Sequence, residues 1–451
     1  NELAGLRMEN EAVFEATHGL VLDLLAQGRI DSLRIDHPDG LYDPVQYFRR
    51  LQDRFASVTG QPPGGQPLYV AIEKITAGYE RVPETWPVHG ATGYRFANLV
   101  NGLFVDSENE ARMSRIYRGF VGEMPEFEQV VYRCKHAILR AALASELNVL
   151  ANQLWRIAQA SRDTRDFTLN SLRRALAEVI ACFPVYRTYI TERPSADDER
   201  FIDWAIARAR KSSRAADVTI YDFVRDVLLS GGDESRPPQW RAMTRAFTGK
   251  FQQLTGPVTA KGVEDTAFYV YNRLVSLNEV GGDPETFGFG VSAFHGASQD
   301  RAENWPHNML ATSTHDSKRS EDVRARISVL SEIPSAWRQS VSRLSRAARS
   351  FRRPLDGEPA PSRNDEYLFY QTLVGTWPLA PMDDNALAAY RERMRAYMIK
   401  AARESKQRTS WISIDQAYET ALAEFVEGLL RSRERNPFVA EIEALTQRVG
   451  W

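Results

Sequence analysis

The chain has 451 residues, of which 43% are hydrophobic and 26% are charged, and its 57 Lys and Arg residues nearly balance its 59 Asp and Glu residues. This composition is typical of a globular protein and excludes a disordered chain, and the net charge of −2 gives no general electrostatic attraction for nucleic acid. No run of 18 uncharged apolar residues occurs, which excludes a membrane-spanning helix. At roughly 150 residues per domain, the length corresponds to about three domains.

The chain contains two cysteines, Cys134 and Cys182. They cannot form a disulfide framework or a zinc site by themselves, so we expect two buried free thiols in a reducing compartment. The sequence shows no secretory signal and no cluster of His and Cys residues at metal-ligand spacing. We therefore predict a cytoplasmic protein without a metal or another cofactor.

The first 73 residues predict two helices that alternate with two short strands, over 13–25, 32–36, 44–56 and 68–73. Gly28 ends the first helix, and Asp43 caps the second, with Pro44 at its first position. Helices and strands that alternate at this spacing are typical of a parallel sheet. The second strand is nearly all apolar, so we expect it to be buried on both faces.

From about residue 109 the pattern becomes helical. Apolar residues spaced at 4, 4, 3, 4 and 3 form one helical stripe, which consists of Leu139, Leu143, Leu147, Leu150, Leu154 and Ile157. Further helices are expected over 169–183, 198–210, 221–229 and 440–451, and a third strand over 309–314. The segment 352–363 is rich in proline and charge, which predicts an exposed loop.

Three acids, Asp36, Glu73 and Asp316, follow the predicted strands. A lone acid after a strand is usually a helix cap or a turn residue. In a (β/α)8 barrel, however, functional residues lie at the C-terminal ends of the strands, where three carboxylates would converge on one cleft. Arg34 precedes Asp36 by two residues, so both side chains are expected on one face of the strand, where the guanidinium favours the ionised carboxylate. An ionised carboxylate near a protonatable one is what retaining glycosidase chemistry requires.

The sequence around these acids resembles the α-amylase superfamily. Its nucleophile region resembles 33–41 (LRIDHPDGL), its acid/base region 72–75 (IEKI) and its third-carboxylate region 312–316 (TSTHD). Longer strings are similar to one member of that superfamily, the maltooligosyltrehalose synthases, and they occupy 93–96, 101–104, 261–269, 278–282 and 315–324. Enzymes of this family isomerise the reducing-end α-1,4 linkage of a maltooligosaccharide to an α,α-1,1 linkage, by intramolecular transglycosylation in two displacement steps.

The resemblance implies an α/β fold, namely part of a (β/α)8 barrel with large all-α insertions. We predict a catalytic barrel segment with strands four to six over 1–108, an all-α insertion over 109–250, a barrel segment with strand seven over 251–320 and a second all-α insertion over 321–451. The family's first short region, its final barrel strand and its C-terminal β-domain have no match in this sequence. Because so few strands cannot close a barrel, we expect a middle fragment that is completed by separate N- and C-terminal pieces of the same enzyme.

The resemblance also assigns roles to single residues. Asp36 would be the nucleophile, Glu73 the general acid and then the base, and Asp316 a carboxylate that hydrogen-bonds sugar hydroxyls. The implied substrate-binding residues are Arg34, His37, Asp39, Tyr94, Lys261, Glu264, His315 and Lys318.

Several of these assignments have a structural alternative. Arg34 could serve only as a structural ion pair, Asp39 only as a turn residue, and His315 as an ordinary buried histidine. Tyr94 and Trp86 could stack on sugar faces or pack in the core. For the two lysines the alternative is an ordinary surface charge.

Two other functions stay open at this point. An α-1,4-glucan hydrolase or glucanotransferase of the same superfamily would share the three acids and differ in how water or a second glucan enters. An inactive helical scaffold or carbohydrate-binding fragment is compatible with the high helix content. The expected partners are a maltooligosaccharide substrate and the complementary pieces of the enzyme, and neither nucleic acid nor a membrane is expected.

Overall fold

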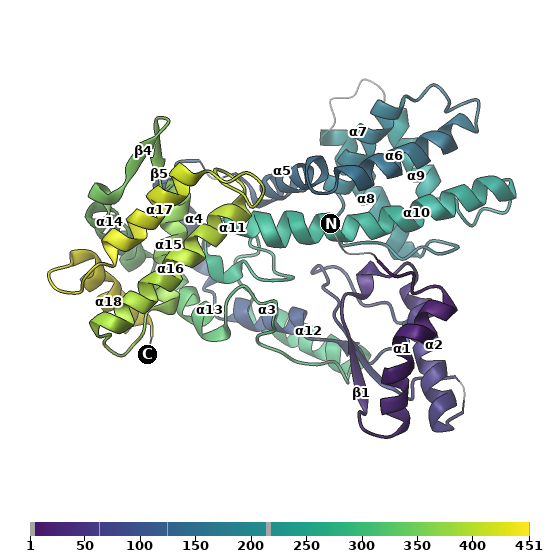
Figure 1. Cartoon of the computed structure of the whole chain (residues 1–451), viewed down its shortest axis with the longest axis horizontal. Helices are drawn as coiled ribbons and strands as arrows, with labels where there is room; N and C mark the ends of the chain where they lie inside the picture. The colour runs from purple at the N-terminus through teal and green to yellow at the C-terminus, as the bar shows by residue number, and fades with distance from the viewer. Residues whose placement is uncertain (1–4, 63, 124, 213–217, 451) are drawn as a thin grey trace. The chain divides into compact units, whose positions relative to one another are not determined.

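The computed structural model describes residues 5–62, 64–123, 125–212 and 218–450. The chain is mostly helical (Figure 1). It forms two compact units. Unit 1 consists of Asn1–Tyr94, Tyr132–Gly262 and Gln299–Ala311, and unit 2 of Arg95–Val131, Val263–Ser298 and Thr312–Trp451. These limits divide the chain by compactness, whereas the predicted domains were defined as barrel segments and insertions. The two divisions are not comparable, so the predicted domain limits stay predictions.

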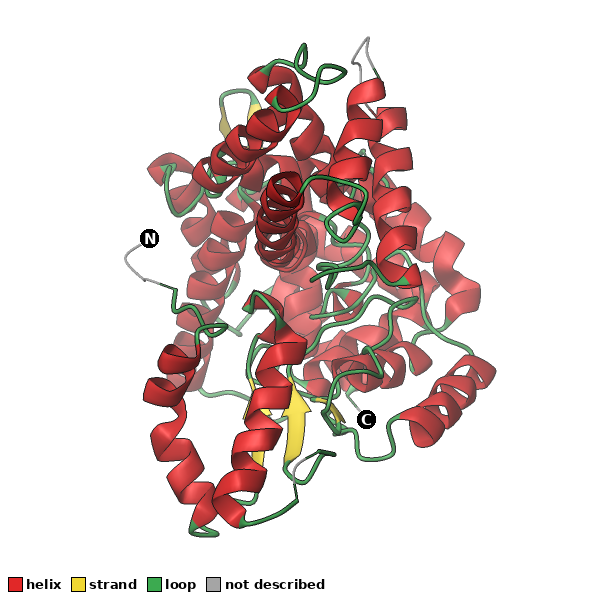
Figure 2. Cartoon of the chain, turned by 90° about the vertical axis from the view of Figure 1, so that its right-hand side faces the viewer, coloured by secondary structure: helices red, strands yellow, loops and turns green. Residues whose placement is uncertain are grey.

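A small parallel sheet lies in unit 1. Its strands are β1 (Ser32–Ile35), β2 (Tyr69–Ile72) and β3 (Gly90–Ala91), in this order, and Figure 2 draws them in yellow. β2 pairs with β1 along its whole length and with β3 at its last two residues. In β2, Val70, Ala71 and Ile72 are at most 2% exposed, so both faces of this strand are buried. The two predicted strands and the burial of the second are confirmed.

The third predicted strand, over 309–314, is wrong, because this segment has no regular secondary structure. It nevertheless follows the sheet, since the N–H of Met309 donates to the carbonyl oxygen of Ala91 at 3.1 Å. The next bond comes from a side chain, because Asn308 Oδ1 accepts from the N–H of Ala91 at 2.6 Å. A side-chain amide thus takes the place of a backbone partner, and no regular ladder forms. β3 itself is too short for any sequence pattern to predict it.

Two helices, α1 (Glu11–Ala26) and α2 (Pro44–Thr59), pack against each other and share a core with the sheet. Asp43 caps α2 as predicted, because its carboxylate accepts from the N–H of Gln46 at 3.0 Å. Gln52 on the buried face of α2 binds both backbone groups of Leu68, at 2.9 and 3.0 Å. This pair of bonds fixes the residue from which β2 starts.

The rest of unit 1 is helical. Its helices are the second half of α5 (Phe127–Arg140), followed by α6 (Ala144–Gln159), α7 (Leu169–Ala181), α8 (Ala196–Ser212), α9 (Thr219–Leu229) and α10 (Pro238–Thr259). The apolar stripe over 139–157 was expected to lie on one helix, but it is divided between α5 and α6. The N–H of Leu143 bonds to the carbonyl oxygen of Ile138 at 3.0 Å, a wide turn that ends α5. Leu139 and the buried leucines of α6 still meet in one core, so spacing predicted their burial but not the break.

Unit 2 is built from helices with one hairpin. Its larger elements are α3 (Tyr94–Leu103), α4 (Glu110–Val121), α13 (Glu321–Ser328), α14 (Pro334–Ala347), α15 (Arg363–Thr376), α16 (Asp384–Ser405), α17 (Gln416–Leu429) and α18 (Pro437–Val449). Its short turns are η2 (Ser107–Asn109), α11 (Phe268–Val270), η4 (Val275–Leu277), η5 (Val329–Ser331) and η6 (Arg349–Phe351), and α12 (Val291–Asn304) extends into the residues of unit 1. The predicted C-terminal helix is α18, and Trp451 lies outside the described residues.

The segment 352–363, which was predicted to be an exposed loop, is an antiparallel hairpin of β4 (Arg353–Leu355) and β5 (Glu358–Ala360). Asp356 and Gly357 form its turn with positive φ angles of 52° and 83°. The tip of the hairpin is exposed, but Ala360 is fully buried. The proline and charge content correctly indicated that the tip of this segment is exposed, but it did not predict that the segment forms paired strands.

Cys134 and Cys182 are buried free thiols, as predicted. None of the described helices combines the length and the apolar character needed to cross a lipid bilayer. A mostly helical chain with few strands agrees in part with the predicted fold class.

Lys135 in α5 allows the energetic cost of a buried charge in unit 1 to be tested. Its side chain is buried, its Nζ donates to the carbonyl oxygen of Phe183 at 2.9 Å, and burial lowers its pKa to about 8. Between this pKa and the ordinary value of 10.5, Lys135 binds more protons in the unfolded chain than in the folded one. The free energy of unfolding therefore rises with pH in this range, and the cost of burying the ammonium disappears. We expect Lys135→Met to raise the free energy of unfolding at neutral pH by roughly 1–3 kcal/mol. Urea titrations of both proteins at several pH values should show this gain shrinking toward pH 10.5, and a gain independent of pH would contradict the account.

Candidate active site

Arg34 and Asp36 mark the C-terminal end of β1. The Arg34 Nη1 atom donates to Asp36 Oδ1 at 2.6 Å, and the side chain of Asp36 is 63% exposed. Burial lowers the pKa of Arg34, but the hydrogen bond to Asp36 and the charge of that carboxylate outweigh burial and raise it. The carboxylate therefore has a permanently charged neighbour and stays open to a ligand. The pairing predicted from the spacing of these residues is confirmed.

Glu73 follows β2 directly, and its N–H donates to the carbonyl oxygen of Ile35 at 2.9 Å. This bond extends the pairing of the two strands by one residue. His37, the residue after Asp36, has a φ angle of 45°, and its N–H donates to Glu73 Oε2 at 2.6 Å. The carboxylate of Glu73 is thus held by the backbone of the loop that carries Asp36. The structure brings these two acids to the ends of neighbouring parallel strands.

The residue after Glu73 belongs to a buried cluster of charges. The side chain of Lys74 is fully buried, and its Nζ lies 2.7 Å from Glu80 Oε1 and 3.3 Å from Asp39 Oδ2. Burial lowers the pKa of Lys74, but the charges of Asp39 and Glu80 outweigh it and raise the pKa, so the ammonium stays protonated. Lys74 follows Glu73, and Asp39 lies in the loop after Asp36. The cluster therefore ties together the two loops that carry the acids.

The loop after β1 is also held from the helical part of unit 1. Arg187, 1% exposed, donates to the carbonyl oxygens of Asp39 and Leu41 at 2.8 and 2.5 Å. The hydroxyl of Tyr189 donates to the carboxylate of Asp39. Because the Asp39 carboxylate is buried and engaged by Lys74 and Tyr189, its contribution is to hold the loop rather than to meet solvent.

The third acid lies in unit 2, in the irregular segment before α13. His315 Nε2 and Asp316 Oδ2 are 3.2 Å apart, and both side chains are exposed, so His315 is not an ordinary buried histidine. The side chain of Lys318 is only 16% exposed, and its Nζ lies 3.0 Å from Asp265 Oδ1. The alternative for this lysine was an ordinary surface charge, whereas its side chain is mostly buried and paired with Asp265.

The remaining predicted residues differ in exposure. Lys261 and Glu264 lie on η3 (Ala260–Ala267), a π-helix, which is a rare form that is frequent at functional sites. Lys261 is exposed, and Glu264 is 9% exposed. Tyr94 and Trp86 are 4% and 1% exposed, which agrees with core packing rather than with stacking on a sugar.

The predicted residues fall into two groups, one in each unit. Unit 1 contains Arg34, Asp36, His37, Asp39, Glu73, Tyr94 and Lys261, and unit 2 contains Glu264, His315, Asp316 and Lys318. Sequence reasoning gave no role to Lys74 or Glu279, although both lie within the strings that carry the resemblance. A lysine directly after Glu73 and before Ile75, at the end of an apolar strand, is the signal that could have drawn attention to Lys74. Among the described residues, no group of three or more His, Cys, Asp and Glu side chains could hold a metal ion.

Several known proteins that are similar to this chain are named maltooligosyltrehalose synthases. A protein of Mycobacterium tuberculosis named "Putative maltooligosyl trehalose synthase" is 32% identical over 458 residues, which cover 99% of this chain and 52% of that protein. The solved structure of maltooligosyltrehalose synthase from Arthrobacter ramosus matches 98% of this chain and 50% of its own, with a TM-score of 0.80 and 33% identity. The hypothetical maltooligosyl trehalose synthase of Sulfolobus tokodaii matches 98% of this chain and 52% of its own, with a TM-score of 0.74 and 30% identity. No family model matches the chain.

The resemblance stated from the sequence is therefore confirmed over nearly the whole chain. The chain spans about half the length of the curated relatives that it matches. The names of these relatives do not favour a hydrolase, a glucanotransferase or an inactive scaffold.

Proposed function

We propose that this chain is about half of a maltooligosyltrehalose synthase and carries the nucleophile and the general acid of its reaction. The reaction converts the reducing-end α-1,4 linkage of a maltooligosaccharide to an α,α-1,1 linkage. The observation that supports this most strongly is the pairing of Asp36 with Arg34, and of Glu73 with the His37 N–H, at neighbouring strand ends. The similarity to synthases over 98–99% of the chain supports the choice of this reaction among those that such a pair could catalyse.

The two acids act in both steps. Asp36 attacks the anomeric carbon of the penultimate sugar while Glu73 gives its proton to the departing oxygen, which leaves a glycosyl ester on Asp36 and a free glucose. After the glucose has turned over, its anomeric hydroxyl loses a proton to Glu73 and attacks the same carbon, and the carboxylate of Asp36 departs. Two inversions at this carbon retain the α configuration. Arg34 donates a hydrogen bond to the carboxylate of Asp36, which is free before the first step and again after the second.

We further propose that the sheet is part of a (β/α)8 barrel, with strands four to six formed by β1, β2 and β3, and that complementary N- and C-terminal pieces complete it. The support for this is a parallel sheet of three strands, and relatives that are about twice as long. We call the chain together with the two missing segments of a synthase the completed enzyme. A cytoplasmic location is part of the proposal, and it is supported by the two free thiols.

The released glucose has to stay bound while water stays out, because water would give hydrolysis. In this proposal, Asp316, His315, Lys318, Lys261 and Glu264 bind sugar hydroxyls. Asp316 would bond hydroxyls more strongly as positive charge develops on the sugar ring.

Lys318 offers a test of how glucose is retained. A charge-assisted hydrogen bond from its ammonium to a sugar hydroxyl is worth roughly 1.5–3 kcal/mol, and ~1.4 kcal/mol corresponds to a factor of ten. We expect Lys318→Met in the completed enzyme to raise the ratio of free glucose to trehalose-ended product about tenfold, with a smaller fall in total maltopentaose consumption. Chromatography at matched conversion measures the ratio, with Lys250→Met, on an exposed lysine of α10, as the control. An unchanged ratio for Lys318→Met would remove this lysine from the glucose site.

The proposed function as a whole is tested on maltopentaose. The completed enzyme should remove reducing ends without releasing an equal amount of glucose, because the trehalose-ended product is non-reducing. The chain by itself should be inactive. Equal amounts of glucose and of shortened oligosaccharide would show a hydrolase, and isomerisation by the chain alone would overturn the need for the complementary pieces.

A further inference from the structure

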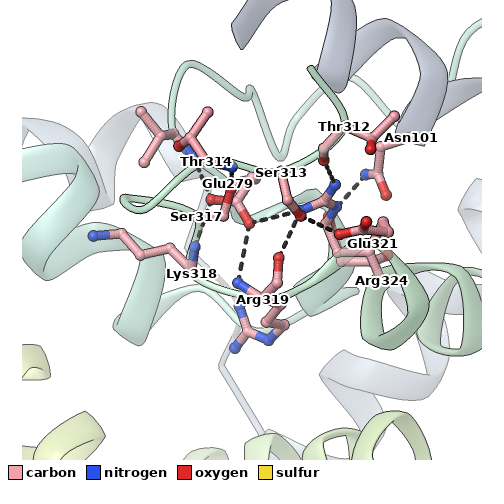
Figure 3. Close-up of polar contacts among 12 residues, drawn as sticks. Asn101, Glu279, Thr312, Ser313, Thr314, Ser317, Lys318, Arg319, Glu321 and Arg324 are labelled. Atoms are coloured by element: carbon pink, nitrogen blue, oxygen red, sulfur yellow. Dashed lines mark hydrogen bonds and ion pairs between the residues drawn. The ribbon is translucent and has the colours of Figure 1, made fainter.

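Glu279 is a buried carboxylate to which the mechanism above gives no role. It follows η4 and is 4% exposed. Its Oε1 accepts from the N–H of Lys318 at 2.7 Å and of Val280 at 2.9 Å, and its Oε2 accepts from the N–H of Arg319 at 3.1 Å (Figure 3). Two of these donors belong to the segment that carries Asp316. In Figure 3 the side chain of Lys318 extends away from Glu279, while its backbone nitrogen lies next to the carboxylate.

Arg324 in α13 completes the arrangement. It is 3% exposed, and its Nη1 lies 3.4 Å from Glu279 Oε2. The same Nη1 donates to the carbonyl oxygen of Arg319 at 2.6 Å, and Nη2 donates to the carbonyl oxygen of Thr312. The guanidinium therefore binds the chain both before and after Asp316. A planar fork with several donors can do this, whereas a single ammonium cannot.

The turn after Glu279 is equally constrained. The N–H of Gly282 donates to the carbonyl oxygen of Glu279 at 2.7 Å. A Cβ atom on Gly282 would lie 2.8 Å from the carbonyl oxygens of both Glu279 and Leu277, so a larger residue does not fit without a shift. The backbone of Glu279 is thus constrained by contacts other than the bonds of its side chain to the loop.

We propose that Glu279 and Arg324 are positioning residues that hold the loop 312–319, and through it Asp316 and Lys318, for the reaction. This inference rests on the proposed function. The bonds of this pair to the segment 312–319 all go to its backbone, while His315 and Asp316 within it keep exposed side chains. A buried pair with only a stabilising role would not need to bind the two ends of one short segment.

The first test uses the completed enzyme and follows hydrogen exchange of the backbone amides of 312–320. In Glu279→Gln, an NH2 group replaces one of the two acceptor oxygens and faces N–H donors instead of accepting from them. Hydrogen exchange at Lys318 and Arg319 should therefore accelerate roughly tenfold or more. The matched control is Glu419→Gln, because Glu419 is also 4% exposed and its carboxylate binds Arg403, at 2.7 Å, and Thr409 rather than this loop. Unchanged exchange in Glu279→Gln, or equal acceleration of this segment in the control, would overturn the clamp.

The second test measures turnover in the completed enzyme. Glu279→Gln should lower kcat roughly tenfold or more, while Glu419→Gln keeps kcat even where it lowers the melting temperature as much. Arg324→Lys should lower kcat as Glu279→Gln does, because lysine keeps the positive charge but lacks the planar guanidinium with its several donors. On an Asp316→Asn background, Glu279→Gln should have little further effect, because the two residues act through the same group.

The outcomes separate the two proposals. An equal loss of turnover from Glu279→Gln with and without Asp316→Asn, or an unaltered kcat in Glu279→Gln, would overturn the positioning role. A wild-type completed enzyme that forms no trehalose-ended product would instead overturn the proposed function, together with any role of the pair in it. The exchange experiment would still decide whether Glu279 and Arg324 hold the loop.

Discussion

Asp36→Asn and Glu73→Gln are each expected to lower kcat of the completed enzyme by roughly three or more powers of ten. Both substitutions keep the size of the side chain. Asparagine cannot form the ester intermediate, and glutamine cannot deliver a proton to the departing oxygen or remove one from the attacking hydroxyl. Because both acids take part in the same bond-breaking step, the double variant should lose little more than either single variant. Maltopentaose consumption under saturating substrate measures kcat.

Asp31→Asn is the matched control, because Asp31 is an exposed carboxylate directly before β1. It should keep the full rate. Asp36→Ala should regain turnover of an activated α-glycosyl donor only when a small external anion replaces the missing carboxylate. More than about a tenth of the wild-type rate in Asp36→Asn or Glu73→Gln would remove that residue from its assigned role.

Lys74→Met is expected to lower the free energy of unfolding by about 3–5 kcal/mol, because it leaves Asp39 and Glu80 buried together without their cation. Burial raises the pKa of Glu80, and without the opposing charge of Lys74 this pKa lies further above its value in the unfolded chain. Between its pKa in the unfolded chain and its higher pKa in the folded variant, the carboxyl group binds more protons in the folded state. The loss of unfolding free energy relative to wild type should therefore be smaller at acidic pH and grow as the pH rises. Urea unfolding at several pH values measures the difference between the two proteins.

The control for Lys74→Met is Asp203→Asn, which breaks the exposed pair with Arg225 in the same unit. An exposed pair contributes only about 0–1 kcal/mol, so this variant should stay close to wild type. A deficit in Lys74→Met no larger than in this control would show that the buried cluster contributes nothing special to the loops after β1 and β2.

The sequence predicted those elements whose determinants are local. Asp43 and Pro44 predict the start of α2, and the apolar run before Glu73 predicts β2. Two of the failures have non-local causes. β3 exists because two residues pair with β2, and the expected strand over 309–314 is irregular because the side chain of Asn308 replaces a backbone partner. No pattern in one segment reveals such a partner in another.

The candidate site divides in the same way. Arg34 and Asp36 could be paired from the alternation of side chains along a strand. The bonds of Lys74 to Glu80 and Asp39, and of Glu279 to the loop 312–319, connect residues that are distant or unremarkable in sequence. Exposure also changed the interpretation of single residues, because Asp39 is buried and Lys318 is paired with Asp265. The acids could thus be read from the sequence, whereas the groups that hold them required the fold.

The central claim is that Asp36 and Glu73 transfer a glycosyl group to the glucose that they have just released. Its most direct test is maltopentaose labelled with 13C at the anomeric carbon of its reducing-end glucose, incubated with the completed enzyme in an excess of unlabelled glucose. Intramolecular transfer predicts that the label stays in the product, as the anomeric carbon of an α,α-1,1 linkage in the NMR spectrum. Label released mainly as free glucose, or unlabelled glucose incorporated into most of the product, would contradict it.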